Sequence, residues 1–456
     1  MSVTRRPLLV ADMTLVTAGA MTANVAGYLL QLLAGRWLGV NGYSEFASLL
    51  AVQLLCAVPA LALQNVVARE FVRGAPVAAL RALQWRCAAI VAALALALVP
   101  VVTFALDVGV LACAGALAAA PAQVLLTGEQ GILQGQRRFR VLAVVLGLAG
   151  ISRVVPALAL LAANAGAGPA LWGTALGLAT AAALARALAG TTGPDMFAPA
   201  ATPAVTEPGH VAAGSVAPER HARAAAADDA PRAGADGHSP AGTASPAETG
   251  GPADERAPVV GVLPVLRAAQ VQAALMAMSS ADLIVVRMVL DEAEAGRYAL
   301  GAIAAKIAFW LPAAVGVVLY PRMAQPAHSA KAIRDALAVL SVLGVLAVAG
   351  AAVAAPLAPL FAGQDYAPVQ GLLWLFALHG AILAVLQGAV LSAIAVDRTT
   401  PAALTWLGLA VEVVLMVLLA RTAPALIGTA VAVAGTTTLL VVAIALRNTA
   451  ARPVGH

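Results

Sequence analysis

The chain has 456 residues, of which 61% are hydrophobic and only 11% are charged. Its mean hydropathy is +0.90, whereas soluble globular domains are nearer half apolar, so composition excludes a soluble globular protein. The formal net charge of +5 does not indicate nucleic-acid binding, because the arginines fall in short loops between apolar runs rather than on one soluble face.

Apolar stretches of about 20 residues, the length that a helix needs to cross a bilayer, recur along most of the chain. These stretches are continuous rather than alternating, which predicts helices and not the strands of a barrel. We therefore predict an all-α, polytopic membrane protein with about twelve transmembrane helices. The predicted spans are 14–36, 44–67, 83–104, 108–134, 141–163, 167–188, 263–286, 298–320, 333–354, 368–394, 401–420 and 424–446.

Residues 190–258 separate the first six spans from the last six. This segment is rich in Pro, Ala, Gly and charged residues and has few large apolar ones, so it cannot bury enough surface to fold. We predict a disordered cytoplasmic linker at 190–258. It would connect an N-terminal six-helix lobe, 1–189, to a C-terminal six-helix lobe, 259–456.

The segment ILQGQRRFRVLA (132–143) places three arginines between two apolar spans. With the N-terminus inside, this loop and every second loop are cytoplasmic and hold most of the loop arginines, as the positive-inside rule requires. Both termini are then predicted to be cytoplasmic. Because six helices return each lobe to its starting side, the lobes are expected to be parallel repeats related by an axis along the membrane normal.

Polar side chains form stripes on the first, second, fourth and seventh predicted spans, and a polar stripe does not face lipid. Two interpretations stay open: hydrogen bonding between helices, and a hydrated cavity between the lobes. The recurrence of long amide side chains on four spans favours the cavity. The candidates to line it are Asn24, Tyr28, Gln31, Gln53, Gln123, Gln130, Gln272 and Asp282.

Two cations fall near the middle of predicted spans. Arg153 lies roughly 19 Å and Lys306 roughly 12 Å along their helices at 1.5 Å per residue. Each costs on the order of 3 kcal/mol in the membrane unless it is paired or hydrated. Structural ion pairs with Glu129, Asp282 or Glu412 would explain both cations, and a cationic patch for an anionic substrate explains them equally well.

The acidic residues near span ends have simple candidate partners. Glu129 is near the inner end of its span, where we expect it to pair with Arg137 or Arg138. Asp282 is near an outer end, where Arg287 is the expected partner.

Glu412 and His379 lie deeper in the last spans and are the candidates for coupling transport to a proton. For Glu412 a structural ion pair, and for His379 a packing role, are the favoured alternatives. The histidines are dispersed, and we find no Cys/His metal spacing, no phosphate-binding glycine loop and no nucleophile elbow. We therefore expect no enzyme activity, no cofactor and no metal.

Several segments resemble polysaccharide-biosynthesis flippases, which belong to the multidrug/oligosaccharidyl-lipid/polysaccharide (MOP) exporter superfamily. WLGVNGYSEFASLLAV (37–52) with NVVAREF (65–71) is similar to the first two helices of that family, and GILQGQRRFRVLA (131–143) to the exit of its fourth span. The stretch from Ala281 to Gln325 is similar to its seventh and eighth spans. The resemblance covers both predicted lobes, and the long linker departs from it.

The resemblance implies a V-shaped transporter of the bacterial cytoplasmic membrane. It would move an oligosaccharide linked to undecaprenyl diphosphate from the inner to the outer leaflet by opening to each side in turn. Arg153 and Lys306, chosen by charge and depth, are the candidates to bind the diphosphate. The implied partners are the lipid-linked glycan, membrane lipids and proteins of cell-envelope polysaccharide assembly, and no nucleic acid.

Three other functions remain open. A cation-coupled multidrug antiporter of the same superfamily needs buried acids in its cavity, whereas the first span carries Asn24 and no carboxylate. A peptidoglycan lipid-precursor flippase usually carries two more helices than the twelve predicted here. A non-transporting membrane scaffold would use the linker for docking, but it does not explain the polar stripes.

Overall fold

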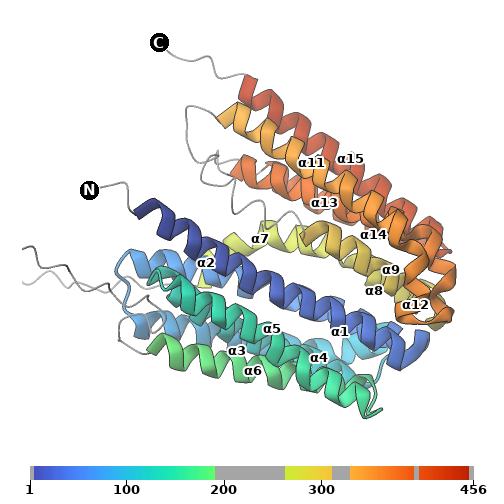
Figure 1. Ribbon diagram of the computed structural model, residues 1–456, viewed down its shortest axis with the longest axis horizontal. Helices are drawn as coiled ribbons and strands as arrows, with labels where there is room; N and C mark the ends of the chain where they lie inside the picture. The colour runs from blue at the N-terminus through green and yellow to red at the C-terminus, as the bar shows by residue number, and fades with distance from the viewer. Residues whose placement is uncertain (1–4, 191–261, 311–328, 395–399, 451–456) are drawn as a thin grey trace, which may run out of the picture. The chain divides into compact units, whose positions relative to one another are not determined.

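The computed structural model describes residues 5–190, 262–310, 329–394 and 400–450. Every regular element in these ranges is helical. The first stretch contains α1 (Arg5–Cys56), α2 (Val58–Val72), α3 (Val77–Leu106), α4 (Val110–Gly135), α5 (Phe139–Ala162) and α6 (Ala167–Gly190). The later stretches contain α7 (Val262–Met278), α8 (Ala281–Val289), α9 (Glu292–Trp310), α11 (Ser329–Ala354), η2 (Ala355–Leu357), α12 (Ala358–Ala362), η3 (Gln364–Leu372), α13 (Leu373–Ile394), α14 (Thr400–Leu419) and α15 (Ala423–Ala450) (Figure 1).

The helices confirm the predicted all-α, polytopic class. Among the described residues, 9 helical segments are long and apolar enough to cross a membrane, and together they cover ten of the twelve predicted spans. The span predicted at 401–420 corresponds to a shorter apolar helix, Ala403–Leu419. The span predicted at 298–320 begins with α9, and its last ten residues lie outside the described ranges.

Helix α1 is 52 residues long and contains the first predicted span and the beginning of the second, which continues in α2. At 1.5 Å per residue an unbroken helix of this length would measure about 78 Å, far more than the bilayer core of about 30 Å. Gly39 breaks it with φ 66° and ψ −179°, a conformation that glycine adopts without steric cost. The glycine therefore ends the first span where the sequence predicts a turn.

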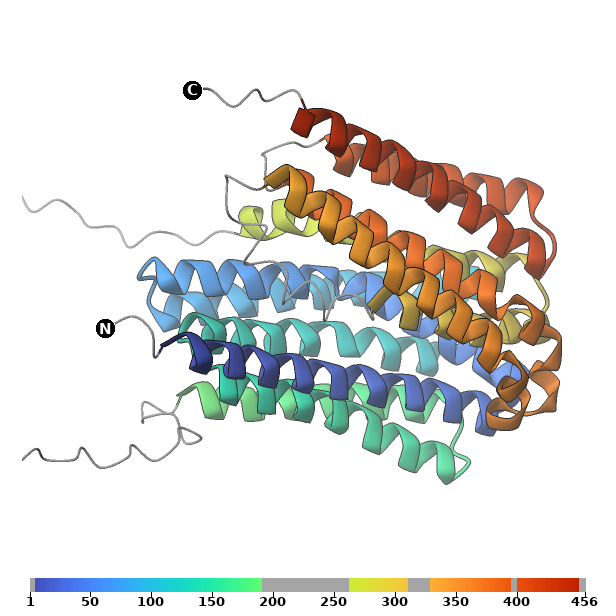
Figure 2. The same ribbon diagram turned by 45° about the horizontal axis from the view of Figure 1, so that its top comes forward.

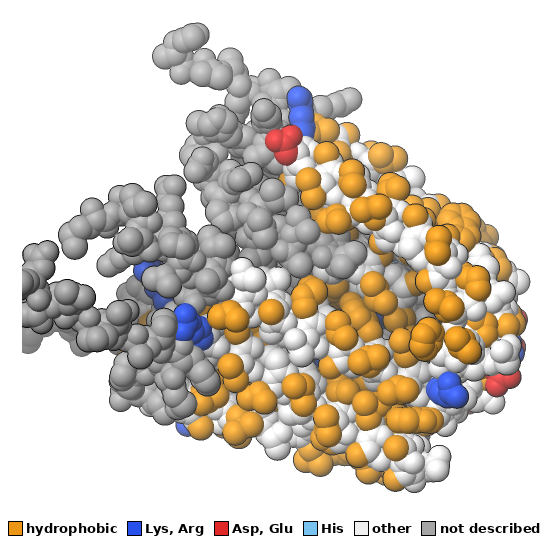
Figure 3. All heavy atoms as spheres, viewed as in Figure 1, with side chains coloured by type: hydrophobic (Ala, Val, Ile, Leu, Met, Phe, Trp, Pro, Cys, Tyr) orange, Lys and Arg blue, Asp and Glu red, His pale blue; other side chains and the backbone are white. Residues whose placement is uncertain are grey.

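The exposed surface of the long helices is apolar. Phe104, Val353 and Leu96 are 93%, 81% and 75% exposed. On the face shown in Figure 3, apolar side chains cover the middle of the helices, and the charged side chains lie near their ends. Such a continuous apolar surface is costly in water and fits the hydrocarbon of a bilayer.

The described helices before and after the undescribed segment 191–261 form one compact unit. In the first stretch, α5 packs on α1 and α6, and α4 packs on α2, α3 and α6; in the later ones, α13 packs on α9, α11 and α15. The two sets meet where α1 contacts α9 and α2 contacts α7 (Figures 1 and 2). The linker at 190–258 lies outside the described residues apart from Gly190. The lobe boundaries and the cytoplasmic termini therefore stay predictions.

Small residues allow the closest helix approaches, as is common between membrane helices. A Cβ atom added at Gly296 of α9 would overlap the carbonyl oxygen of Val40 in α1. One added at Gly380 of α13 would overlap the carbonyl oxygen of Ala305 in α9. Helix α9 is thus packed closely against both α1 and α13. One of the two predicted cations, Lys306, lies on this helix.

Candidate functional site

Arg153 lies on α5 with its side chain against α1. Its Nη2 atom is 2.8 Å from the position that a Cβ atom would take at Gly27, so the missing side chain of Gly27 makes room for the guanidinium group. Arg153 is half-buried. Among the described residues no hydrogen bond or ion pair of its side chain is found. The expected pairing of this arginine with a carboxylate is therefore not seen in the described part of the chain.

Lys306 lies on α9, and its backbone contacts Tyr28, the α1 residue that follows Gly27. The Tyr28 hydroxyl donates a hydrogen bond of 3.2 Å to the carbonyl oxygen of Lys306, which joins the two sets of helices at this depth. The Lys306 ammonium group interacts electrostatically with the Asp282 carboxylate. The Arg153 side chain and the Lys306 backbone thus contact adjacent residues of α1, and Lys306 is the cation whose charge is partly offset.

Asp282 is 2% exposed in the first turn of α8. Its Oδ2 atom accepts a hydrogen bond of 3.1 Å from the Tyr298 hydroxyl, and its Oδ1 atom accepts one of 2.8 Å from the backbone N–H of Leu283. The expected pairing of Asp282 with Arg287 is wrong. Arg287 lies more than one turn further along α8 and points to other helices, as described below.

Glu412 and His379, the coupling candidates, are both fully enclosed. Glu412 on α14 is 0% exposed and His379 on α13 is 1% exposed. Within the described ranges, neither carboxylate oxygen of Glu412 and neither ring nitrogen of His379 has a hydrogen-bond partner. Glu412 interacts electrostatically with Asp282 and Tyr298. The favoured structural ion pair of Glu412 with a cation is not seen in these ranges.

The predicted cavity residues differ in exposure. Asn24, Tyr28 and Gln31 are half-buried along α1, and Gln123 and Gln272 are half-buried on α4 and α7. The remaining two amides are buried, as Gln53 is 6% and Gln130 is 3% exposed. Two further amides of the polar stripes join α2 to α4: Gln64 donates to Gln134 at 3.3 Å. A hydrated cavity between the lobes stays a prediction.

Glu129 is 2% exposed on α4 and forms a two-point ion pair with Arg81 of α3. The Arg81 Nε and Nη2 atoms donate to its two oxygens at 3.0 and 3.1 Å, and Arg186 approaches it at 4.0 Å. The expected pairing of Glu129 with Arg137 or Arg138 is wrong. Arg138 instead donates to the carbonyl oxygen of Leu188 at 2.9 Å.

Glu129→Ala should destabilise the protein strongly, because it leaves a mostly buried arginine without its carboxylate. We expect a loss of about 3 kcal/mol, the usual cost of removing one partner of a buried pair. The matched control is Glu70→Ala. Its partner Arg73 is 63% exposed, so the loss should stay below about 1 kcal/mol. Thermal unfolding of the purified protein in detergent measures both, and equal melting temperatures for the two variants would refute the buried pairing.

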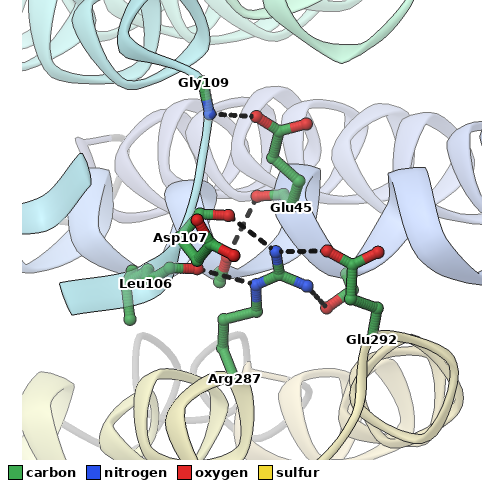
Figure 4. A network of polar contacts seen from close by, with 8 residues as sticks. Glu45, Leu106, Asp107, Gly109, Arg287 and Glu292 are labelled. Carbon is green, nitrogen blue, oxygen red and sulfur yellow. Dashed lines mark hydrogen bonds and ion pairs between the residues drawn. The ribbon is translucent and has the colours of Figure 1, made fainter. Parts of the chain in front are cut away.

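A second polar network, which was not predicted, joins α8 to the end of α3 and to the part of α1 that follows Gly39 (Figure 4). The Arg287 side chain is 5% exposed. It donates at 2.9 Å to each of the carbonyl oxygens of Leu106 and Asp107, and at 3.1 Å to the Ser44 hydroxyl. It also pairs with Glu292 at 2.9 Å. One guanidinium group therefore connects three segments that are far apart in sequence.

The chain segment that Arg287 binds is itself held in a special conformation. Asp107 has φ 48° and ψ 58°, in the left-handed region, and ends α3. The following Gly109 donates its N–H to Glu45 of α1 at 2.8 Å. The last carbonyls of a helix carry a partial negative charge and lack partners within the helix, so a buried guanidinium group suits this position.

Further contacts join α1 to the segment between α11 and α13. The Tyr366 hydroxyl donates to the carbonyl oxygen of Gly35 at 3.0 Å, and Arg36 donates to that of Leu360 at 3.3 Å. The Tyr43 and Tyr366 rings meet edge to face at 6.3 Å. Together with the Arg287 network, these contacts hold the two sets of helices together next to the break at Gly39.

The protein is similar to known proteins in its fold and not in its sequence. No protein-family model matches the chain, and no curated protein sequence matches it. Among solved structures, the lipid II flippase MurJ in an inward closed conformation is similar over 97% of this chain and 88% of that chain, with 12% identity and a TM-score of 0.64.

Two further solved structures support the same class. A MATE transporter of Vibrio cholerae matches over 98% of this chain and 99% of its own, with 14% identity and a TM-score of 0.53. A MOP superfamily transporter from Pyrococcus furiosus matches over 96% of each chain, with 12% identity and a TM-score of 0.51. The described helices therefore share the fold of these three solved transporters, and identities this low do not identify a substrate.

Proposed function

We propose that this chain is a flippase of the MOP type. It translocates an oligosaccharide or polysaccharide precursor linked to undecaprenyl diphosphate from the inner to the outer leaflet by alternating access. The observation that carries this proposal is Arg153, a cation within an apolar helix, half-buried against Gly27, with no ion pair among the described residues. An anionic diphosphate is the substrate group that such an arginine binds well, in a charge-assisted and two-point manner.

Lys306 extends the same patch from the other side of α1. Its backbone carbonyl oxygen accepts from Tyr28, the neighbour of Gly27, so α9 packs at Lys306 on the stretch of α1 that Arg153 contacts. Because the Asp282 carboxylate already offsets the Lys306 charge, we assign Arg153 the larger share of diphosphate binding. The glycan then lies among the half-buried polar residues of α1, and the polyprenyl chain stays in lipid.

A cation-coupled multidrug antiporter is the second candidate, and the buried carboxylates of Asp282 and Glu412 favour it. Each is no more than 2% exposed, and two carboxylates that interact with each other at such a depth suit a cationic ligand. In a flippase the same pair serves as the coupling site, with a proton as the driving ion. The distinction between the two functions therefore depends on which substrate moves.

The proposed setting is the bacterial cytoplasmic membrane, with both termini in the cytoplasm and with proteins of envelope polysaccharide assembly as partners. The experiment is leaflet-resolved measurement of undecaprenyl-diphosphate-linked glycan in cells that lack the protein. We expect accumulation in the inner leaflet that the wild-type chain reverses. Normal glycan distribution with lost resistance to cationic drugs would instead support the antiporter, and accumulation of the peptidoglycan lipid precursor alone would identify that flippase function. No change in any of these would favour the scaffold.

A further inference from the structure

A groove of about 670 Å³ runs between α11 and α15 with α13 as its floor. Its volume is within the range of small-molecule sites. On α11 it is lined by Ser341, Val345, Val348 and Ala352, and small residues on the other helices, such as Gly435, keep it open. It lies away from α1 and α5, and none of its lining residues belongs to the proposed substrate patch.

The groove offers hydrocarbon contacts and no free polar group. Its two hydroxyl groups are used by helix backbone, because Ser341 donates to the carbonyl oxygen of Leu337 at 2.8 Å and Thr438 to that of Ala434 at 2.7 Å. The rim is exposed and apolar, with Val345 at 67% and Leu439 at 72% exposure. In a membrane such a hollow is filled by a hydrocarbon chain, since an empty one loses dispersion contacts on every wall.

The groove is about as long as one leaflet of a bilayer is thick, and it begins about 10 Å along α11 from Arg334 at 1.5 Å per residue. From Ser341 to Ala352 the α11 lining extends over about 16 Å at 1.5 Å per residue, and half of the hydrocarbon core is about 15 Å. One acyl chain of a membrane phospholipid has this reach. A polyprenyl chain is several times longer than a leaflet and carries methyl branches, so it fits this site less well.

A cation lies on α11 beyond the Ser341 end of the groove, so a chain whose phosphate contacts it enters the groove at that end. Arg334 precedes Ser341 by seven residues, two helical turns, so it shares the face of α11 that lines the groove. It is exposed and opens the apolar span Arg334–Ala362, which puts it at the membrane interface. Asp335 follows it but points to a different face, about 100° around the helix.

We propose that this groove binds one acyl chain of an anionic glycerophospholipid whose phosphate contacts Arg334. The chain enters the space between α11 and α15 at its Ser341 end and holds these two helices at their spacing over α13 there. This site is separate from the translocated substrate, and the proposal does not depend on which substrate is moved.

The test is native mass spectrometry of the full chain in detergent with equal amounts of phosphatidylglycerol and phosphatidylcholine. We expect the wild type to retain one phosphatidylglycerol. Gly435→Leu fills the groove, because a Cβ atom there meets only Ile382 at 3.9 Å, and should lower retention by about tenfold through lost apolar contact. Arg334→Gln should lower the preference for phosphatidylglycerol by about fivefold.

The matched control is Gly350→Leu on α11, where an added Cβ atom meets nothing within 4 Å and the residue does not line the groove. It should retain the lipid as the wild type does. Equal retention by Gly435→Leu and Gly350→Leu would overturn the proposal. Displacement of phosphatidylglycerol by an equal amount of undecaprenyl phosphate would overturn the choice of an acyl chain.

A second measurement uses the folded wild type and does not depend on the groove-filling variant. Trp374 lines the groove, so phosphatidylglycerol brominated on its acyl chains should quench the fluorescence of this tryptophan. The difference in fluorescence between the wild type and Trp374→Phe gives the contribution of Trp374. Quenching equal to that of the lipid-facing Trp406, which is 43% exposed and outside the groove lining, would contradict a bound chain.

Discussion

Arg287→Ala should lower the stability of the protein by about 2–3 kcal/mol and loosen the contact between α8 and the end of α3. The guanidinium group is almost fully buried and donates to two backbone carbonyls and one hydroxyl. Its removal leaves the Leu106 and Asp107 carbonyls without this donor, and each such loss costs about 1–3 kcal/mol. Glu292 adds little to this cost, because it is 56% exposed and returns to water.

Arg287→Ala should also change how often the region around Ser44 becomes accessible to water. Under the proposed alternating access, contacts that close one end must break when that end opens, so the Arg287 network would bias the population of states. We expect Ser44→Cys to react slowly with a water-soluble maleimide in the otherwise wild-type chain. The rate should rise by about tenfold or more when Arg287→Ala is added, since about 2 kcal/mol shifts a two-state equilibrium by that factor.

Two variants make the Arg287 test specific. Arg287→Lys keeps the charge but not the planar set of donors, and it should recover only part of the lost stability. Arg297→Ala is the matched control, because Arg297 makes a single bond of 2.8 Å to the carbonyl oxygen of Asp365. If Arg287→Ala and Arg297→Ala were equally stable and equally labelled at position 44, the network would not hold the two sets of helices together.

Arg153→Ala should reduce transport of the lipid-linked glycan by about 10- to 100-fold, with little change in insertion or melting temperature. A charge-assisted hydrogen bond to phosphate contributes about 1.5–3 kcal/mol, which corresponds to that range. Stability should be spared, because Arg153 makes no hydrogen bond or ion pair among the described residues that would be lost. Arg153→Lys should keep part of the activity, as a single point charge replaces a two-point donor.

The second cation and a control complete this test. Lys306→Ala should reduce transport less than Arg153→Ala, and it also leaves Asp282 without its nearby positive charge. Arg73→Ala removes a cation that is 63% exposed and bonded to Glu70, and it should transport as the wild type does. Full export by the double variant Arg153→Ala/Lys306→Ala would show that these two cations do not bind the substrate.

Most helices could be predicted from the sequence, because the length of an apolar run is set directly by the thickness of the bilayer. Every predicted span falls on a described helix for all or part of its length. The finer breaks were not predictable from composition. Ser279–Ser280 separate α7 from α8 within the single span predicted at 263–286, whereas the break at Gly39 falls between the first two predicted spans.

The partners of charged residues were much harder to predict, since they depend on how helices rotate and pack. Glu129 was expected to use an arginine a few residues away, but it binds Arg81, 48 residues earlier in the chain. Arg287 was expected to pair locally, but it binds carbonyls 180 and 181 residues away. Backbone acceptors such as these leave no signal in side-chain identity, so only the structure reveals them.

The central claim, translocation of a lipid-linked oligosaccharide, is tested most directly with the purified protein in unilamellar vesicles. A fluorescent oligosaccharide on undecaprenyl diphosphate is placed in the vesicles, and its appearance in the opposite leaflet is followed by accessibility to a membrane-impermeant quencher. We predict rapid translocation with the wild type and a rate near that of protein-free vesicles with Arg153→Ala/Lys306→Ala. Equal rates with wild-type and protein-free vesicles, together with uptake of a cationic drug by the wild type, would contradict the flippase.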